Sequence, residues 1–414
     1  MTTSNEQFSD ITIEVTKILT KQEKKDYGIF ITPYIIIQKL IDSVNTYVSN
    51  NNISIKKILE PSCGTCEIIK YCDNYFKNVQ IHGIEFNQII YDKIKGLQFN
   101  NNNNTVRLEF SNFIKYNTTT KYDLIVGNPP YFVCKKEDIP QEYKEYCVGR
   151  PNVFGFFILH SLSFLNSGGI LAFIIPKSFL NSAYYAPVRN YIKQTCNILE
   201  IIDFEEYNKF IDTDQSTIGL IIQKHVVSIE PIECKFSVKI NDTFIFTNDS
   251  TMLRQLFEGA TTIDKMGLKV RTGNIVWNEH KVELTDDSDA TLLIYNTNIS
   301  KDNKLEIKKF KNDTKGQYIK KEGKTEPLLV VNRGNGNSAY KLNYALITQG
   351  PYLIENHLNE IYSPKKITHE ELLDVYSKII TSFNNPKTQQ FIKLFLGNNG
   401  LSKTELETIF PIYV

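Results

Sequence analysis

The chain has 414 residues and carries 47 Lys and Arg against 46 Asp and Glu. Its length exceeds what one hydrophobic core usually fills, so we expect two domains. With 41% hydrophobic and 22% charged residues, the composition excludes a mostly disordered or fibrous protein. The formal net charge of +1 gives no basic surface over the whole chain, so a nucleic-acid partner would be held by a local patch.

Cysteine usage and the N-terminal sequence predict a compartment. Seven cysteines, an odd number, do not form a disulfide framework and favour a reducing environment. The N-terminus has neither a basic nor an apolar leader segment, and no uninterrupted apolar run reaches the roughly 18 residues of a membrane span. We therefore expect a soluble protein of the cytoplasm or another intracellular compartment, with no membrane partner.

Apolar runs and turn residues predict the first elements in chain order. A helix is expected around residues 11–25, and a second over residues 35–48, starting at Thr32-Pro33 because Thr is a good N-cap and Pro a good first residue. Short apolar runs then alternate with helical stretches. They predict strands at residues 57–59, 79–84, 105–110, 122–126, 169–175, 198–204 and 216–223. Such alternation is typical of an α/β fold with a largely parallel sheet.

The pattern changes after about residue 225. Alternating apolar residues at 234–238 predict a hairpin or an edge ribbon. A second region begins near residue 250, and residues 301–324 contain nine Lys against four acids. This stretch could bind a polyanion, although Lys-rich stretches are usually solvated loops. Arg333-Gly334-Asn335-Gly336-Asn337 adds a second basic turn.

The segment Glu60-Pro61-Ser62-Cys63-Gly64 follows a buried strand as a tight turn, the layout of a cofactor crevice. Glu85 ends the next strand 21 residues beyond Gly64, where a carboxylate suits a ribose diol. The turn lacks the glycine pattern that binds a pyrophosphate, so a nucleoside cofactor such as S-adenosylmethionine fits better. The alternative is an ordinary strand, turn and acidic strand end. Cys63 and Cys66 have no second cysteine pair, so we predict no metal.

The segment Asn128-Pro129-Pro130-Tyr131 directly follows the predicted strand at residues 122–126. Proline lacks an N–H group and stiffens the chain, so carbonyl oxygens at this strand end are left facing the crevice. An amide acceptor, a backbone acceptor and an aromatic ring are thereby brought together. This combination is far more specific than a simple turn.

These segments resemble the gamma (TaqI-like) class of S-adenosylmethionine-dependent DNA adenine-N6 methyltransferases. Residues 60–64 are similar to the cofactor motif and residues 128–131 to the catalytic motif, in that order. Tyr27-Gly28-Ile29-Phe30-Ile31-Thr32-Pro33 resembles the segment that packs on the cofactor's methionine moiety. Residues 152–157 and 168–176 also follow the pattern. The resemblance spans residues 27–222 closely and residues 265–414 loosely.

The resemblance implies S-adenosylmethionine as the cofactor. It assigns Thr32 and Glu60 to the methionine end, Glu85 to the ribose, and Phe86 and Phe113 to the two faces of the adenine ring. The family usually has Asp where this chain has Asn112, which exchanges a charged acceptor for a neutral one. The full expected cofactor set is Thr32, Glu60, Pro61, Ser62, Cys63, Gly64, Glu85, Phe86, Asn112, Phe113, Asn128 and Pro130.

The resemblance also implies a catalytic set, Asn128, Pro129, Pro130 and Tyr131. The Asn128 side-chain oxygen and the Pro129 carbonyl would accept both amino hydrogens of an adenine flipped out of the duplex. Tyr131 would stack on this base and Phe173 would pack against it. The alternative for Phe173 is a core aromatic residue on a buried strand. For base or phosphate contacts in the second domain we expect Arg271 and Arg333, with Asn274 and Asn337 as further candidates.

The predicted fold is an α/β, doubly wound, mostly parallel Rossmann-like methyltransferase sheet followed by a smaller α+β target-recognition domain. Residues 1–249 would form the S-adenosylmethionine-binding catalytic domain and residues 250–414 the DNA target-recognition domain. The expected partner is double-stranded DNA, read by a monomer, with a cognate restriction endonuclease acting separately. The alternatives are methylation of an RNA base, of a protein glutamine or of cytosine N4, and a DNA-binding protein with an inactive methyltransferase fold.

Overall fold

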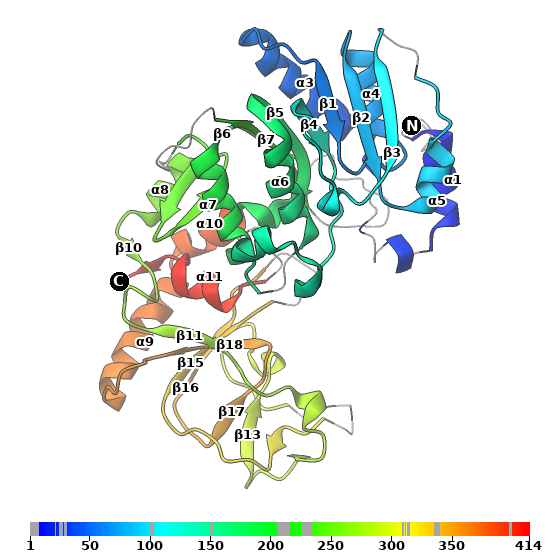
Figure 1. Ribbon diagram of the computed structural model, residues 1–414. Coiled ribbons are helices and arrows are strands. Elements are labelled where there is room, and N and C mark those ends of the chain that lie inside the picture. Colours follow the sequence, from blue (N-terminus) through cyan, green and yellow to red (C-terminus); the bar gives the residue numbers. More distant parts are fainter. Residues whose placement is uncertain are drawn as a thin grey trace, which may run out of the picture. The chain divides into compact units, whose positions relative to one another are not determined.

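The chain is described here by a computed structural model (Figure 1). It describes residues 8–20, 22–24, 28, 31–99, 103–149, 152–204, 216–225, 234–308, 310, 312, 315–334, 340–396 and 400–414. The chain divides into two units. The first comprises Met1–Leu180, Tyr184–Ser237 and Phe244–Asn248, and the second comprises Asn181–Ala183, Val238–Thr243 and Asp249–Val414.

One sheet organises the described part of the first unit. Its seven strands lie in the order β3-β2-β1-β4-β5-β7-β6. All neighbours pair in parallel except β7, which runs antiparallel to both β5 and β6. This confirms the largely parallel α/β sheet, and each predicted strand matches an observed one to within four residues at either end. The strands are β1 (Lys57–Glu60), β2 (Gln80–Glu85), β3 (Thr105–Phe110), β4 (Tyr122–Gly127), β5 (Leu165–Pro176), β6 (Cys196–Asp203) and β7 (Thr217–Lys224).

The inner strands of this sheet are buried on both faces, as a doubly wound fold requires. Successive residues of β5 belong to different cores: Ala172 faces the core built with α3 (Tyr34–Asn50) and α4 (Glu67–Tyr75), whereas Leu171 faces the core built with α6 (Val153–Phe164). The helix α6 is apolar on all sides and buried along most of its length. The described part of this unit also contains the α-helices α1 (Asp10–Ile18), α5 (Gln88–Ile94) and α7 (Ala186–Thr195).

Two helix predictions need correction. The first helix, α1, ends at Ile18 and not near residue 25, because Leu19 is already extended. The second, α3, begins at Tyr34, and its N-cap is Pro33 and not Thr32. The Thr32 hydroxyl accepts a hydrogen bond from the side chain of Asn128, 2.9 Å away. The residue that looked like a helix cap is therefore used elsewhere.

The second unit has short strands and several helices. One sheet has the order β11-β18-β15-β16 and another the order β12-β14-β13-β17. The strands are β11 (Lys269–Thr272), β12 (Leu284–Thr285), β13 (Thr291–Ile294), β14 (Tyr318–Ile319), β15 (Leu328–Asn332), β16 (Tyr344–Ile347), β17 (Tyr352–Ile354) and β18 (Leu358–Tyr362). The helices are α8 (Ser250–Phe257), α9 (His369–Phe383), α10 (Pro386–Phe395) and α11 (Lys403–Thr408), and β10 (Ala260–Thr261) pairs with β19 (Ile412–Tyr413).

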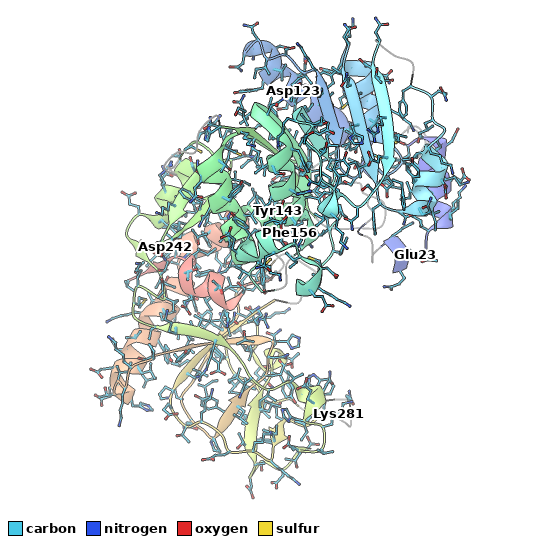
Figure 2. The ribbon with its side chains drawn as sticks, in the orientation of Figure 1. Glu23, Asp123, Tyr143, Phe156, Asp242 and Lys281 are labelled. Atoms are coloured by element: carbon cyan, nitrogen blue, oxygen red, sulfur yellow. The ribbon has the colours of Figure 1, made fainter. Side chains whose placement is uncertain are left out.

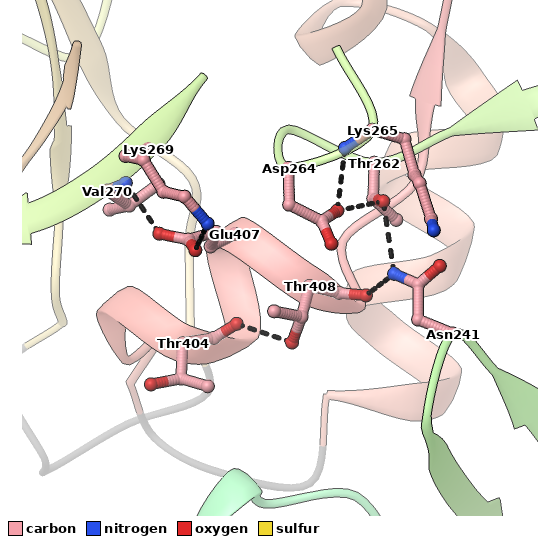
Figure 3. Close-up of polar contacts among 9 residues, drawn as sticks. All are labelled: Asn241, Thr262, Asp264, Lys265, Lys269, Val270, Thr404, Glu407 and Thr408. Carbon is pink, nitrogen blue, oxygen red and sulfur yellow. Dashed lines mark hydrogen bonds and ion pairs between the residues drawn. The ribbon is translucent and has the colours of Figure 1, made fainter. Parts of the chain in front are cut away.

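The C-terminal helix α11 is tied to earlier parts of the second unit by polar contacts (Figure 3). Glu407 accepts hydrogen bonds from the Lys269 ammonium and the Val270 backbone, at 2.9 and 2.7 Å. The carbonyl of Thr408 accepts from the Asn241 amide at 2.6 Å. Asn241 lies between β8 (Ser237–Ile240) and β9 (Thr243–Phe246), the hairpin predicted from the alternation at residues 234–238.

Candidate active site

A cavity of about 520 Å³ lies at the carboxyl ends of the central strands of the first unit. Strands β2 and β4 flank β1 on opposite sides, and a ligand crevice is expected where the strand order reverses in this way. The turns that follow all three strands contribute to its wall: Pro61, Ser62 and Gly64 after β1, Glu85, Phe86 and Asn87 in and after β2, and Asn128 and Pro130 after β4. Thus most of the predicted cofactor residues line one cavity.

A smaller cavity of about 60 Å³ accounts for the remaining ones. Thr32, Glu60 and Cys63 line it, and it shares Ser62, Gly64 and Asn128 with the larger cavity. Gly64, in the turn between the two, has a φ of +50°, a conformation that glycine adopts most readily. The predicted turn therefore forms the boundary of both cavities.

Glu60 carries a buried carboxyl group in the wall of the smaller cavity. The residue is 3% exposed, and its Oε2 atom has no hydrogen-bond partner among the described residues. Burial, together with the nearby Cys66 and Glu85, raises the pKa of Glu60 well above its ordinary value. A buried acid with an unpaired oxygen is suited to a cationic ligand group, because such a group would compensate the cost of its negative charge.

Glu85 is held in place by backbone donors. Its Oε2 accepts from the N–H of Gly64 at 2.8 Å, and its Oε1 accepts from the N–H of Asn87 at 2.6 Å. Burial raises the pKa of Glu85, while these backbone hydrogen bonds act in the opposite direction. Each carboxylate oxygen has a further lone pair, so the group can still accept hydrogen bonds from a diol in the cavity.

Asn112 and Phe113 follow β3 and also line the larger cavity. The Asn112 side-chain oxygen accepts from the N–H of Ile114 at 3.1 Å and caps a short 3-10 helix. The ring of Phe113 is buried and lies 5.1 Å from the ring of Phe157, whereas Phe86 on the same cavity is 54% exposed. Of the two aromatic residues predicted to flank the adenine ring of the cofactor, Phe113 is therefore fixed by packing and Phe86 faces solvent.

The loop Asn128–Tyr131 follows the carboxyl end of the central strand β4. Asn128 and Pro130 line the larger cavity, and Pro129 is buried. Besides donating to Thr32, the Asn128 side chain accepts from the hydroxyl of Tyr131. The same hydroxyl lies 2.8 Å from the carbonyl of Ile174, and burial raises the pKa of Tyr131 well above its ordinary value. The phenol consequently stays protonated and can act as a donor.

Gly28 and Phe173 both lie near this loop, and they relate to it differently. Gly28 has a φ of +60°, and a Cβ atom there would lie 2.5 Å from the backbone nitrogen of Tyr131. The glycine of the segment 27–33 therefore allows the chain to pass close to the catalytic loop, while Tyr27, Ile29 and Phe30 lie outside the described residues. Phe173 is fully buried in the core of the sheet and does not line the cavity. Its predicted contact with a base needs correction, because no part of its ring is exposed.

Sequence reasoning missed part of the cavity wall. Val153, Phe156 and Phe157 of α6 line it, together with Ile139 and Pro140. Phe156 lies beside Tyr143, with ring centroids 6.2 Å apart, and both are labelled in Figure 2. The available signal was the fully apolar start of α6, but an apolar helix is equally typical of a protein core.

The predicted basic residues of the second unit have partners within it. Arg271 donates to Glu360 at 2.8 Å, and its guanidinium lies 4.4 Å from the ring centroid of Tyr362. Arg333 donates to the carbonyl of Asn356 at 2.8 Å. Asn274 is exposed, and Asn337 lies outside the described residues. Neither arginine extends freely into solvent.

The seven described lysines of residues 301–324 fall into three groups: exposed, ion-paired and packed among aromatic rings. Lys301, Lys304 and Lys320 are exposed, and Lys309 and Lys311 lie outside the described residues. Others form ion pairs: Lys308 with Glu306, Lys321 with Glu283 and Lys324 with Glu360. The Lys315 ammonium lies 4.2, 4.5 and 5.1 Å from the ring centroids of Tyr295, Phe310 and Trp277, and burial lowers its pKa. The excess of positive charge is thus smaller at the surface than the count suggests.

No cluster of potential metal ligands occurs among the described residues, and no helix in that part of the chain is long and apolar enough to cross a membrane. The seven cysteines all lie within the described ranges, and none of them forms a disulfide bond there.

Comparison with known proteins adds a family to this geometry. Residues 9–210 match the model of the Eco57I restriction-modification methylase family. The Type II methyltransferase M.CvrRI of Paramecium bursaria Chlorella virus XZ-6E is 28% identical over 415 residues, covering 98% of this chain and 99% of that protein. The modification methylase CviBIII of Paramecium bursaria Chlorella virus NC1A is 28% identical over 423 residues, covering 99% of each.

A solved structure extends the likeness in fold. The Type IIL restriction-modification enzyme MmeI, in complex with DNA, superposes with a TM-score of 0.56 over 95% of this chain and 69% of that one. The two sequences are 10% identical over this match, so the likeness concerns the fold.

The sheet order, the cavity at its strand ends and the matched family define an S-adenosylmethionine-dependent methyltransferase with a Rossmann-like fold. More narrowly, the chain is a DNA methyltransferase of the restriction-modification kind. The residues present fit the cofactor. The unpaired Glu60 oxygen can meet the ammonium group of its methionine end, and Glu85 retains acceptor capacity for its ribose.

Proposed function

We propose that this protein methylates the N6 amino group of adenine at a specific site in double-stranded DNA, as a Type II enzyme of the gamma class. The observation that carries the proposal is the loop Asn128–Tyr131, whose amide lines the cavity that also contains the predicted cofactor residues. The order of the segments, with the cofactor turn ahead of the catalytic loop, supports the gamma class.

The chemistry of an exocyclic amino group explains why this loop is suitable. The lone pair of such a nitrogen is delocalised into the ring, which makes it a poor nucleophile. S-adenosylmethionine supplies an electrophilic methyl group when bound. The Asn128 side-chain oxygen and the Pro129 carbonyl would accept the two amino hydrogens and favour a pyramidal nitrogen with its lone pair directed out of the ring plane. As the new carbon–nitrogen bond formed, the methyl–sulfur bond would break and leave a neutral thioether; the nitrogen would then release one of its protons. Positioning and electrostatics account for the rate, and no general base is needed to start the reaction.

The location of Asn128 supports the proposal that the base leaves the duplex. The amide is partly buried, at the wall of a cavity, and a stacked base cannot bring its amino group to such a position. Unstacking costs a few kcal/mol, and stacking on an aromatic side chain returns about 1–3 kcal/mol. We assign Tyr131 as that neighbour because it follows the two acceptor groups directly and lies on the loop, not on a paired strand. The residue is 9% exposed and does not line the cavity in this structure, so stacking requires its ring to turn toward the base.

A fluorescent base tests this assignment. With 2-aminopurine at the target position, Tyr131→Ala should reduce the fluorescence increase on binding more than it weakens cofactor binding. Tyr131→Phe keeps the ring and should retain the increase. An unchanged response in Tyr131→Ala would remove Tyr131 from contact with the base.

For the second unit we propose a role in holding and reading the duplex. The exposed lysines Lys301, Lys304 and Lys320 are the better candidates for phosphate contacts, because Arg271 and Arg333 have partners within the protein. The site that is read depends on side chains that reach base edges in the grooves.

One assay separates the proposed reaction from the alternatives. The protein is incubated with methyl-labelled S-adenosylmethionine and duplex DNA, total RNA or a release factor, and the nucleic acids are digested to nucleosides. We expect label in N6-methyladenine from DNA alone, and none with Asn128→Ala. Label in N4-methylcytosine, RNA or protein would replace the proposal with the corresponding alternative.

A further inference from the structure

Two buried hydroxyl groups hold the side chain of Asn128. Its Nδ2 donates to the Thr32 hydroxyl at 2.9 Å, and its Oδ1 accepts from the Tyr131 hydroxyl. Thr32 is 7% exposed and Tyr131 is 9% exposed, so both side chains lie largely inside the protein. The amide is therefore restrained from both ends by groups that belong to different segments of the chain.

Tyr131 has a second acceptor within reach. Its hydroxyl lies 2.8 Å from the carbonyl of Ile174 on β5. Strand β4 ends at Gly127, and Pro129 and Pro130 have no N–H with which to continue its pairing with β5. The phenol thus supplies a donor where the backbone cannot. A phenol has one proton, so it can serve Asn128 or Ile174 at a given moment, but not both.

These contacts matter because Asn128 must offer an oxygen to the target. A partly buried amide oxygen without a hydrogen-bond donor raises the free energy of the folded protein. Before the target binds, the Tyr131 hydroxyl supplies a donor to the Asn128 oxygen, and it must release that oxygen when the target amino group arrives. The raised pKa of Tyr131 keeps this proton on the phenol. Donation from Nδ2 to Thr32 also polarises the amide and strengthens its oxygen as an acceptor.

We propose that Thr32 and Tyr131 are positioning residues for Asn128: the Thr32 hydroxyl fixes the amide, and the Tyr131 hydroxyl occupies its oxygen until the target amino group arrives and then turns to the Ile174 carbonyl. This inference rests on the proposed function, since it concerns the same reaction. It differs from the role that the resemblance implies for Thr32, which is contact with the methionine end of the cofactor.

The two roles of Thr32 predict different kinetics. If Thr32 acts through Asn128, Thr32→Val should lower kcat by about tenfold and change the cofactor Kd by less than about threefold. Thr32→Ser keeps the hydroxyl and should restore kcat to within about threefold of the unmodified protein. A cofactor Kd that rises about tenfold with an unchanged kcat would overturn the proposal and assign Thr32 to the cofactor.

A second pair of measurements tests whether the effect passes through Asn128. Tyr131→Phe should lower kcat by about threefold while keeping the 2-aminopurine response. In an Asn128→Ala background, neither Thr32→Val nor Tyr131→Phe should lower the residual single-turnover rate further. Equal losses in both backgrounds would overturn the proposal.

These outcomes are distinguishable from failure of the proposed function. The unmodified protein is assayed first with duplex DNA, and absence of N6-methyladenine at that stage contradicts the proposed reaction before any variant is compared. Thermal unfolding of each variant accompanies the kinetics. A loss of kcat that tracks a loss of folded protein, and that Thr32→Ser does not repair, would also count against the positioning role.

Discussion

The two units of the protein differ in what their polar groups contact. In the first unit, Glu60 has an unpaired carboxylate oxygen and Asn128 lines a cavity. In the second unit, Arg271 and Lys324 both pair with the buried Glu360, and Lys315 lies among aromatic rings. A motif at the end of a strand places its residues at a defined edge of the sheet, whereas a local excess of charge does not determine whether that charge reaches solvent.

The largest effect that tests this comparison is expected at Asn128. Asn128→Ala removes the side-chain acceptor and should lower the rate of methyl transfer by about 10²–10³-fold, the loss typical of removing one preorganised polar group from an active site. Cofactor affinity should stay within about threefold, because the amide contributes mainly to the target. Single-turnover kinetics and equilibrium dialysis measure the two quantities.

Asn112→Ala is the matched control for this variant, since Asn112 lines the same cavity and belongs to the predicted cofactor residues. It should weaken cofactor binding more than the chemical step. Near-normal turnover of Asn128→Ala would contradict the assignment of the loop as catalytic.

The pH dependence of stability is expected to follow Glu60. Burial raises its pKa above the ordinary value of 4.5, so the ligand-free folded protein binds a proton that the unfolded chain releases. The resulting stability is present below the unfolded pKa and is lost as pH rises through the folded pKa. Thermal unfolding of the ligand-free protein from about pH 5 to about pH 8 should therefore show falling stability.

Glu60→Gln should reduce this decline, and Glu85 should account for part of what remains because burial raises its pKa also. The affinity for the cationic cofactor should change with pH in the opposite direction to the stability. The cofactor favours the charged carboxylate of Glu60, so its affinity should increase as pH rises over the same range, and Glu60→Gln should lower the affinity by about tenfold. Equal cofactor affinity for Glu60→Gln and the unmodified protein would contradict the role of Glu60.

A smaller effect, on stability, is expected at Gly28. Gly28→Ala places a Cβ atom 2.5 Å from the backbone nitrogen of Tyr131, and a backbone atom cannot move aside as the end of a flexible side chain can. The residue also has a φ of +60°, which is unfavourable for alanine. We expect a loss of about 1–3 kcal/mol in the free energy of unfolding. Gly96 is the matched control, because a Cβ atom there meets nothing within 4 Å. Chemical denaturation of Gly96→Ala should show no loss, and equal losses in the two variants would contradict the close approach.

The smallest effect concerns the lysines of the second unit. Replacing Lys301, Lys304 and Lys320 with Gln should make DNA binding less dependent on salt. The slope of the logarithm of the binding constant against the logarithm of the salt concentration should become less steep by about 0.9 for each phosphate contact that is lost. Lys324→Gln is the control, since this lysine pairs with Glu360, and it should leave the slope unchanged. An unchanged slope in the triple variant would exclude these lysines from phosphate binding.

Much of the first unit could be predicted because each of its strands is a separate apolar run bounded by turns. The carboxyl ends of parallel strands share one edge, so Glu60, Glu85 and Asn128 could be expected to meet from the order of the strands alone. The second unit was less accessible, since strands such as β12 and β14 have two residues each and pair across more than 30 residues of chain.

The errors within the site have physical causes. An aromatic residue on a buried strand looks the same in sequence whether it lines a cavity or fills the core, and Phe173 fills the core. Thr32 precedes a helix and resembles an N-cap, but its hydroxyl accepts from Asn128. Composition cannot show that Lys315 turns inward, because the rings of Trp277, Tyr295 and Phe310 that surround it come from separate segments.

The central claim is that the loop Asn128–Tyr131 directs methyl transfer to adenine in a defined DNA sequence. Single-molecule sequencing of genomic DNA from a host that expresses the protein tests it most directly. We predict N6-methyladenine at one recurring sequence in cells with the unmodified protein, and none above background with Asn128→Ala. Unmodified adenines in both strains, or modification that persists in Asn128→Ala, would contradict the account.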